Sequence, residues 1–254
     1  MLIFDFDGVL INSIDEVVLT TYNATTANLR TELTDLPPEL VSLFKRNRFH
    51  VQPIGDAILM MQWCLNNYQS APGRMLTPQE YQSIITETAV ALKVRSDRIY
   101  KARSRFIEKD QQAWMALHRP YQPIWNNLIR SDYQQLVILT NKNKDATLRL
   151  CRFFDLNVDE NNVYPGDHGI TKSQHMRRIQ ERFETASFYF IDDSVKNLKQ
   201  LDEDINQDKK VLALMFARWG YKGPHDQKLA ESYGYPVFNQ KGLISFFEKR
   251  IKAL

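Results

Sequence analysis

The chain has 254 residues, of which 43% are hydrophobic and 25% charged; this is typical of a globular protein and argues against wholesale disorder. Lys and Arg total 33 against 30 Asp and Glu, and a net charge of +3 is too balanced for a dedicated nucleic-acid binder. Two cysteines, Cys64 and Cys151, form no C-x-x-C pair, so neither a zinc site nor a thioredoxin-like redox motif is expected. No signal-peptide pattern and no stretch near the ~20 apolar residues of a membrane span occurs, so we expect a cytoplasmic protein without membrane association.

Short apolar segments with strand-like composition recur along the chain. They are Leu2–Phe6, Leu136–Leu139, Phe188–Ile191 and Val211–Met215, with Pro236–Phe238 as a shorter candidate. Their continuous apolar character is typical of strands buried on both faces of a parallel sheet. Helical patterns alternate with these segments from residue 136 onward. The sequence therefore predicts an α/β fold with a Rossmann-like parallel sheet and helices on both faces.

The stretch between the first two segments predicts a different structure. From about Asn12 to Leu117 there is no convincing strand, and apolar residues recur at helical spacing, for example over Tyr81–Leu92 and Ile99–Leu117. An insertion of about 100 residues is the size of a domain. We therefore expect an α/β core formed by residues 1–11 and 119–254, interrupted by an all-helical domain over residues 12–118.

Two carboxylates stand at the end of the first apolar segment. Asp5 and Asp7 are two residues apart, and Gly8 follows them and allows a tight turn. Ligands bind at the carboxyl ends of the strands in open α/β sheets, and two anions there are costly unless a cation or a reaction uses them. Such a cluster suits Mg²⁺, although a strand that ends in a solvated Asp turn is the simpler alternative.

Polar residues also follow later segments. Thr140 comes directly after an apolar strand, where its hydroxyl and the turn amides could hold a phosphate or merely cap a helix. Lys172 lies in the first turn of a helix predicted by the capping box Thr171–Gln174. A cation there opposes the helix dipole, so Lys172 is either an exposed lysine or a group that neutralises a bound phosphate.

The adjacent acids Asp192 and Asp193 end another buried strand. Like Asp5 and Asp7, they place two anions where burial is costly unless a cation or a reaction uses them. A shared Mg²⁺ would stabilise both pairs, while an Asx turn or a helix cap is the alternative.

Four such signals in this order are far more specific than any one of them. Together they resemble the haloacid dehalogenase-like hydrolase superfamily, and the resemblance covers the whole chain. The helical insertion resembles the cap domain of one branch of that superfamily. The matching motifs are Asp5-Phe-Asp7-Gly8-Val9, Thr140, Lys172 and the pair Asp192-Asp193.

The resemblance implies a Mg²⁺-dependent phosphatase that acts on a small phosphorylated metabolite. Asp5 would attack phosphorus and form an aspartyl-phosphate, and Asp7 would protonate the leaving group and then activate water. Thr140, Asn141 and Lys172 would bind the phosphoryl oxygens. The implied metal ligands are Asp5, the Asp7 backbone carbonyl and Asp193, with Asp192 as a candidate through water.

The chain also departs from the family pattern. Asn197 stands near the place where the fourth motif often carries another aspartate, and the usual Lys-Pro of the third motif is Lys172-Ser173 here. Lys142 is therefore a competing candidate for the motif lysine. The segment Ala217–Tyr221 faintly resembles a part of phosphoglycolate-type phosphatases, although an aromatic loop that covers the sheet edge is the preferred interpretation.

Two basic stretches leave the substrate open. Arg46 and Arg48 lie where the caps of this family often carry a specificity loop, and they suit a second phosphate or carboxylate of the substrate. Lys93 to Lys109 carries seven basic residues, which are usually a solvated helix face. Nucleic acid is not the expected partner, but a phosphatase of polynucleotide ends or of proteins, a phosphomutase and a non-catalytic binding protein remain alternatives. The sequence leaves the oligomeric state open.

Overall fold

The computed structural model describes residues 1–130, 136–184, 187–207 and 210–251. The chain forms two compact units, which we describe separately. The core unit comprises Met1–Asn12 and Pro120–Leu254, and the helical unit comprises Ser13–Arg119. Among the described residues, none of the helices combines the length and the apolar character that a bilayer crossing requires.

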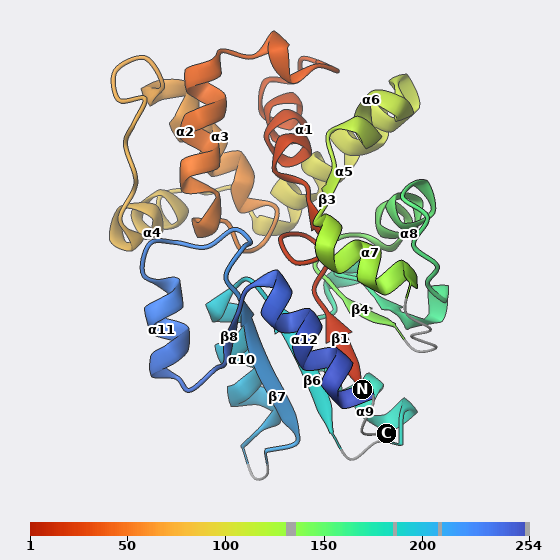
Figure 1. Cartoon of the computed structure of the whole chain (residues 1–254). Coiled ribbons are helices and arrows are strands. Elements are labelled where there is room, and N and C mark those ends of the chain that lie inside the picture. Colours follow the sequence, from red (N-terminus) through yellow and green to blue (C-terminus); the bar gives the residue numbers. More distant parts are fainter. Residues whose placement is uncertain (131–135, 185–186, 208–209, 252–254) are drawn as a thin grey trace. The chain divides into compact units, whose positions relative to one another are not determined.

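Six of the described strands form one parallel sheet in the core unit, in the order β5-β4-β1-β6-β7-β8 (Figure 1). The register places Ile3 of β1 opposite Val137 of β4 and Phe190 of β6. The predicted Rossmann-like parallel α/β sheet is therefore confirmed. The strands are β1 (Leu2–Phe4), β4 (Val137–Leu139), β5 (Val163–Tyr164), β6 (Phe188–Asp192), β7 (Leu212–Ala217) and β8 (Val237–Phe238). A separate two-stranded sheet pairs β2 (Ile11–Asn12) with β3 (Arg119–Pro120).

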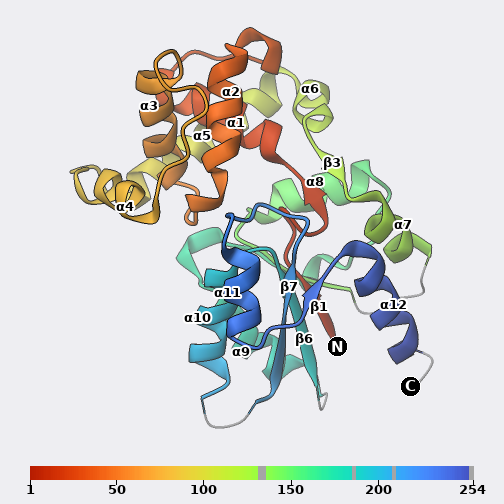
Figure 2. The ribbon, with the colours of Figure 1, turned by 60° about the vertical axis from the view of Figure 1, so that its left-hand side comes forward.

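Helices cover both faces of this sheet, as predicted (Figure 2). On one face α9 and α10 bury Met176, Ile179 and Leu198 against Ile3 and Phe190. On the other face the Phe4 ring lies 5.5 Å from Phe247 of α12, and Phe6 lies 6.2 Å from Trp125 of α7. The helices of the core unit are α7 (Gln122–Arg130), α8 (Lys144–Phe153), α9 (Lys172–Arg182), α10 (Val195–Ile205), α11 (Asp226–Ser232) and α12 (Gln240–Ile251).

The helical unit is built from helices, but apolar periodicity in the sequence predicts only some of their boundaries. Its helices are α1 (Ile14–Thr26), α2 (Pro38–Asn47), α3 (Asp56–Asn67), α4 (Pro78–Thr86), α5 (Leu92–Lys109) and α6 (Gln111–Ala116). The pattern over Tyr81–Leu92 is not one helix, since α4 ends at Thr86. The pattern over Ile99–Leu117 breaks at Asp110, whose carboxylate accepts a hydrogen bond from Ala113 N at 2.9 Å and caps α6.

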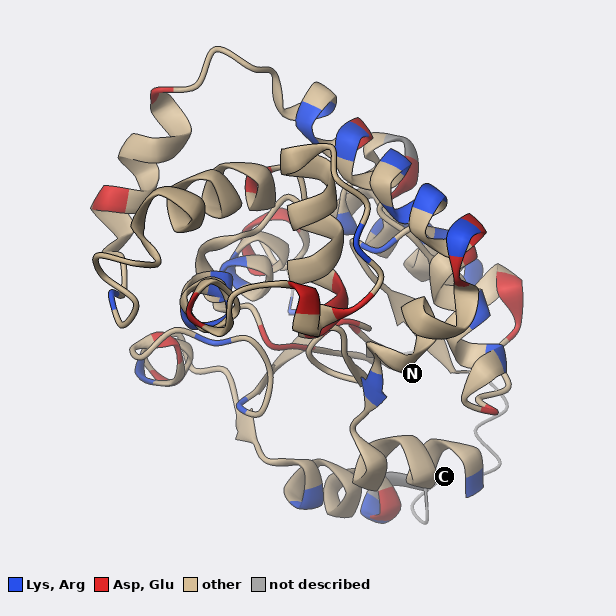
Figure 3. Cartoon of the chain, turned by 90° about the horizontal axis from the view of Figure 1, so that it is seen from above, with Lys and Arg blue, Asp and Glu red and all other residues tan. Residues whose placement is uncertain are grey.

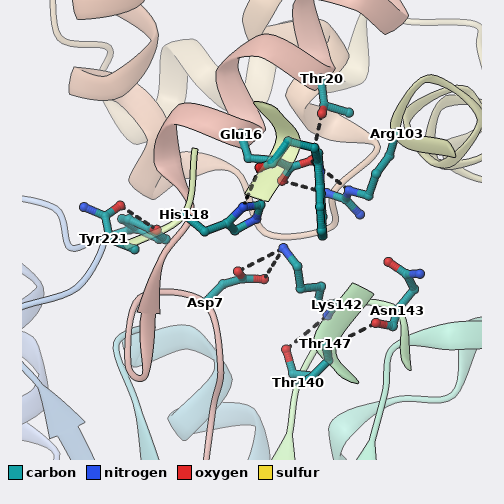
Figure 4. Close-up of polar contacts among 12 residues, drawn as sticks. Asp7, Glu16, Thr20, Arg103, His118, Thr140, Lys142, Asn143, Thr147 and Tyr221 are labelled. Carbon is teal, nitrogen blue, oxygen red and sulfur yellow. Dashed lines mark hydrogen bonds and ion pairs between the residues drawn. The ribbon is translucent and has the colours of Figure 1, made fainter. Parts of the chain in front are cut away.

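A buried ion pair ties α1 to α5 inside the helical unit (Figure 4). Glu16 is fully buried, and Arg103 Nε and Nη2 lie 2.8 and 3.1 Å from its two oxygens. Thr20 and Trp114 also donate hydrogen bonds to Glu16 Oε1, at 2.7 and 3.3 Å. The Glu16 carboxylate is shielded from water, so the Arg103 cation and these hydrogen bonds have to compensate its buried charge.

We expect Arg103→Met to destabilise the helical unit by about 3–5 kcal/mol, because it leaves the Glu16 carboxylate buried without its cation. Hydrogen exchange of the α1 and α5 amides in the intact chain measures the loss directly. Arg105→Met, at an exposed position of the same helix, is the matched control and should change stability by less than about 0.5 kcal/mol. Equal exchange rates in the two variants would contradict the proposed contribution of the Glu16–Arg103 ion pair to the stability of the helical unit.

Candidate active site

Three of the motif residues emerge at one edge of the core sheet, because its strands are parallel and end there. Asp5 follows β1, and its backbone N–H donates to Ile191 O at 2.9 Å. Thr140 follows β4 and donates its N–H to Tyr164 O at 3.0 Å. Asp192 is the last residue of β6. All three residues are buried, so the edge gathers polar groups with little exposure to water.

Side-chain alternation explains which groups meet at this edge. Ile3 and Phe190 face α9 and α10, and every second residue along a strand shares a face. Asp5 and Asp192 therefore extend toward the same side, where α9 begins with Lys172. Lys172 Nζ lies 2.6 Å from Asp192 Oδ2 and 3.1 Å from Asp5 Oδ1.

Asp192 holds this lysine and is itself held. Its Oδ1 accepts a hydrogen bond from Ser194 N at 2.8 Å, and its Oδ2 accepts one from Asn197 Nδ2 at 3.0 Å. A fully buried carboxylate needs such partners, and here they orient it toward Lys172. Asn197 thus supports Asp192 in this chain.

Burial and charge shift the pKa values of the two groups that meet here. Burial raises the pKa of Asp5 to about 7, Lys172 opposes the rise, and the charges of Asp192 and Asp7 add to it. Burial lowers the pKa of Lys172, but the carboxylates of Asp192 and Asp5 outweigh that effect, so its pKa lies above the ordinary value. Lys172 is therefore a cation, and it favours the charged form of the Asp5 carboxylate.

A tight turn follows β1 and brings the chain against Asp193. Gly8 adopts a φ of 87°, and a Cβ atom there would lie 2.6 Å from Asp193 Cγ. Leu10 and Ile11 donate their N–H groups to Phe6 O at 2.9 and 3.0 Å, which closes the turn. Only glycine satisfies both the left-handed backbone and the close approach.

The loop after β7 completes the surroundings of Asp193. Tyr221 N donates a hydrogen bond to Asp193 Oδ2, and Trp219 Nε1 donates to Val9 O at 3.1 Å. A Cβ atom at Gly220 would lie 2.5 Å from Gly8 O. The segment Ala217–Tyr221 is therefore more than a cover of the sheet edge, because its backbone orients an acid of the site.

Asp7 has a lysine partner of its own (Figure 4). Lys142 Nζ lies 3.1 Å from Asp7 Oδ1, and the lysine side chain is only 1% exposed. The Lys142 N–H donates to Thr140 Oγ1 at 3.1 Å, so the residues after β4 form one hydrogen-bonded turn. Each of the first-motif acids is thus paired with a different lysine.

The residues present fit a divalent cation. Oxygens of Asp5, Asp192 and Asp193 lie within 4.8 Å of one another. Asp5 Oδ1 is buried, and it lies 3.1 Å from Lys172 Nζ. Four carboxylates, those of Asp5, Asp7, Asp192 and Asp193, face two lysines, so one divalent cation would neutralise the cluster. Mg²⁺ prefers such carboxylate oxygens.

No protein-family model and no curated protein matches the sequence. Solved structures do match the fold. A predicted phosphoglycolate phosphatase from Haemophilus somnus has a TM-score of 0.60 at 14% identity, over 97% of each chain. A haloacid dehalogenase-like family protein from Streptococcus pneumoniae has a TM-score of 0.57 at 14% identity, over 97% of each chain. The chain has the fold of the haloacid dehalogenase-like hydrolases. A hydrolase from Pseudomonas syringae has a TM-score of 0.57 at 13% identity, over 98% of this chain and 97% of its own.

This haloacid dehalogenase-like fold confirms the resemblance at the level of architecture and brings most of the predicted site together. Asn141 is exposed beside Thr140. Arg46 lies on α2 and Arg48 in the turn after it, both in the helical unit, and their part in substrate binding stays a prediction. The predicted site residues that meet at the edge of the core sheet are Asp5, Asp7, Thr140, Lys172, Asp192 and Asp193.

The basic stretch of α5 is not a uniform solvated face. Arg95 and Arg103 are buried and pair with Asp56 and Glu16, so they belong to the interior of the helical unit. The other five basic residues are exposed: Lys93, Arg98, Lys101, Arg105 and Lys109. In Figure 3 several Lys and Arg positions follow one another along one helix, with a few Asp and Glu positions among them.

Sequence reasoning missed two contributors to the site. The pairing of Lys142 with Asp7 had a signal, since Lys142 follows Thr140 by two residues and was already a competing candidate. Gly220 lies in the segment Ala217–Tyr221, which the sequence marked only by a faint resemblance, and its close approach to Gly8 had no local signal because the two positions are more than 200 residues apart.

Proposed function

We propose that this chain is a Mg²⁺-dependent phosphatase of a small phosphorylated metabolite, and that it works through an aspartyl-phosphate on Asp5. The observation that carries the proposal is the buried contact of Lys172 with Asp5 and Asp192, beside a second acid, Asp7. A buried carboxylate that is held against a cation, with another carboxylate nearby, suits nucleophilic attack followed by acid–base catalysis. We further propose that residues 1–11 and 119–254 form the catalytic core and residues 12–118 the cap, with the cytoplasm as the location.

The first half-reaction uses two carboxylates in different roles. A carboxylate oxygen of Asp5 attacks phosphorus, so an O–P bond forms as the ester P–O bond breaks. Asp7 in its protonated form gives its proton to the departing alkoxide oxygen. Lys172, Thr140 and the Asn141 backbone bind the phosphoryl oxygens and favour the charge that develops on them.

The second half-reaction returns the site to its starting state. Asp7, now a carboxylate, takes a proton from a water molecule, and the resulting hydroxide attacks phosphorus. The bond between Asp5 and phosphorus breaks, and inorganic phosphate leaves. Asp192 remains paired with Lys172 throughout and keeps the ammonium group in place.

We propose Asp5, Asp193 and the Asp7 backbone carbonyl as the holders of Mg²⁺. Bound there, the ion would neutralise the phosphoryl group and orient it toward Asp5. Asp193 is preferred over Asp192 as a direct ligand, because both oxygens of Asp192 already accept hydrogen bonds from Ser194, Asn197 and Lys172.

A panel of phosphorylated metabolites, assayed for release of inorganic phosphate in Mg²⁺, tests this function. We expect turnover of at least one small monoester, with little dependence on salt. Preference for a polynucleotide end, with activity falling steeply as salt rises, would instead implicate the exposed cations of α5. Transfer of the phosphoryl group to a second position of the same sugar would indicate a phosphomutase. No turnover of any ester would favour a non-catalytic binding protein.

Gly220→Ala should lower kcat/KM by about 10²-fold, because misplacing a catalytic group by about 1 Å has an effect of that size. The added methyl would meet Gly8 O and Asp193, so either the turn or the carboxylate has to move. Gly73→Ala is the matched control, since no atom lies within 4 Å of a Cβ there. Unchanged kcat/KM in the Gly220→Ala variant would show that the loop does not position Asp193.

A further inference from the structure

Lys142 is a buried cation that has no role in the two half-reactions described above. Its Nζ lies 3.1 and 3.5 Å from the two carboxylate oxygens of Asp7. The motif lysine, Lys172, contacts Asp5 and Asp192 instead. The site therefore contains two lysines with separate carboxylate partners rather than two alternatives for one role.

The backbone around Lys142 is fixed from both sides. Its N–H donates to Thr140 Oγ1 at 3.1 Å, and its carbonyl oxygen accepts a hydrogen bond from Gly166 N at 3.3 Å. Gly166 packs so closely that a Cβ there would lie 2.5 Å from Asn141 O. A lysine with an anchored backbone and a 1% exposed side chain has little rotamer freedom left.

Asp7, the partner of Lys142, is more exposed and less constrained than the lysine. The Asp7 side chain is 22% exposed, and it stands on the turn that Gly8 makes possible. A carboxylate at the water boundary can rotate unless something holds it, and an acid–base group has to stay within hydrogen-bond reach of the proton that it transfers. The contact with Nζ fixes one direction for the Asp7 carboxylate.

We propose that Lys142 is a positioning residue for Asp7, which rests on the phosphatase function proposed above. Lys142 keeps its own proton. The proton that moves belongs to Asp7, which gives it to the alkoxide oxygen as the P–O bond breaks and later regains one from water. The competing role for Lys142 is direct contact with a phosphoryl oxygen, like that proposed for Lys172.

The leaving group separates these two roles. An alkoxide needs a proton as it departs, whereas p-nitrophenolate is stable without one, so only the alkyl ester depends on a well-placed acid. A lost contact with the phosphoryl group would affect both esters alike. The measurement is kcat/KM, which reports the steps up to departure of the leaving group.

The experiment compares wild type with Lys142→Met, using glycerol 2-phosphate and p-nitrophenyl phosphate in Mg²⁺. We expect about a 10²-fold loss of kcat/KM for glycerol 2-phosphate and less than about a 3-fold loss for p-nitrophenyl phosphate, in line with the size of general acid catalysis. Lys144→Met, which removes a half-exposed lysine two residues along the chain, is the matched control and should behave as wild type. Lys142→Arg keeps the charge and should recover part of the loss for glycerol 2-phosphate.

Equal losses for the two esters, or no loss for either, would overturn the positioning role and leave the phosphatase function standing. If Lys142→Met does not fold, the same comparison is made with Lys142→Arg, whose altered geometry should still affect glycerol 2-phosphate more. A wild-type protein that hydrolyses no monoester would instead remove the proposed function, and the role of Lys142 with it.

Discussion

Asp5→Asn should lower phosphomonoester hydrolysis by at least about 10⁴-fold, since loss of a nucleophile removes the covalent route altogether. The amide of asparagine has the same shape as the carboxylate but is a very weak nucleophile. It would also leave Lys172 with one carboxylate partner, Asp192, at 2.6 Å. The lysine would stay paired, so we expect the fold to survive while the chemistry is lost.

Asp145→Asn is the matched control for this substitution. Asp145 is exposed and pairs with Arg149 on the surface of α8, so its loss should change activity by less than about 2-fold. Circular dichroism of both variants checks that they fold. If Asp5→Asn hydrolyses phosphate esters at the rate of Asp145→Asn, the assignment of Asp5 as nucleophile is wrong.

Chelation of divalent cations should abolish hydrolysis, and added Mg²⁺ should restore it. The cluster of Asp5, Asp7, Asp192 and Asp193 carries more negative charge than Lys142 and Lys172 balance, and a phosphoryl group brings more. Without a cation the substrate and Asp5 repel each other. The measurement is phosphate release after treatment with EDTA and after titration with MgCl₂.

Two variants assign the acids of the fourth motif. Asp193→Asn should raise the Mg²⁺ concentration needed for half-maximal activity by about 100-fold or more, as expected for loss of a metal ligand whose supporting contacts alone are worth 10–100-fold. Asp192→Asn should lower kcat through Lys172 and shift the Mg²⁺ requirement much less. Full activity in EDTA would contradict the metal site, and equal shifts in the two variants would contradict the division between Asp192 and Asp193.

The fold and most of the polar residues at the carboxyl edge of the core sheet could be predicted, because short stretches of sequence indicate them. Apolar strands that end in Asp5, Thr140 and Asp192 reveal themselves in short stretches, and parallel strands bring their ends together without further information. The capping box at Thr171 places Lys172 at a helix start, and the structure shows the same box. Each of these steps needs only neighbouring residues.

Contacts between distant segments could not be predicted in this way. Nothing near Gly220 indicates that it packs on Gly8, and nothing near Arg103 indicates that it neutralises Glu16 on another helix. The start of the helix at Pro38–Asn47 is hard to predict for a local reason, because proline breaks a helix at most positions yet is favourable as its first residue. Side-chain pairing across the chain is decided by tertiary packing, which periodicity does not contain.

The proposed substrate contacts of the helical unit, at Arg46 and Arg48, could not be assigned by such reasoning either. Arg46 is exposed on α2, and Arg48 Nη1 donates to Val51 O at 2.7 Å. Neither observation identifies the substrate group that these arginines would bind. The basic composition around them is compatible with a second anionic group on the substrate, and only the substrate panel distinguishes the candidates.

The phosphorylation of Asp5 is tested most directly with the Asp7→Asn variant and p-nitrophenyl phosphate. This ester departs without an acid, but the second half-reaction needs Asp7 to activate water. We therefore expect a rapid release of one equivalent of p-nitrophenol per chain, followed by a stall, with the phosphoryl group on Asp5 in peptides from the acid-quenched protein. Continued turnover at the wild-type rate, or a phosphoryl group on any other residue, would contradict the aspartyl-phosphate mechanism.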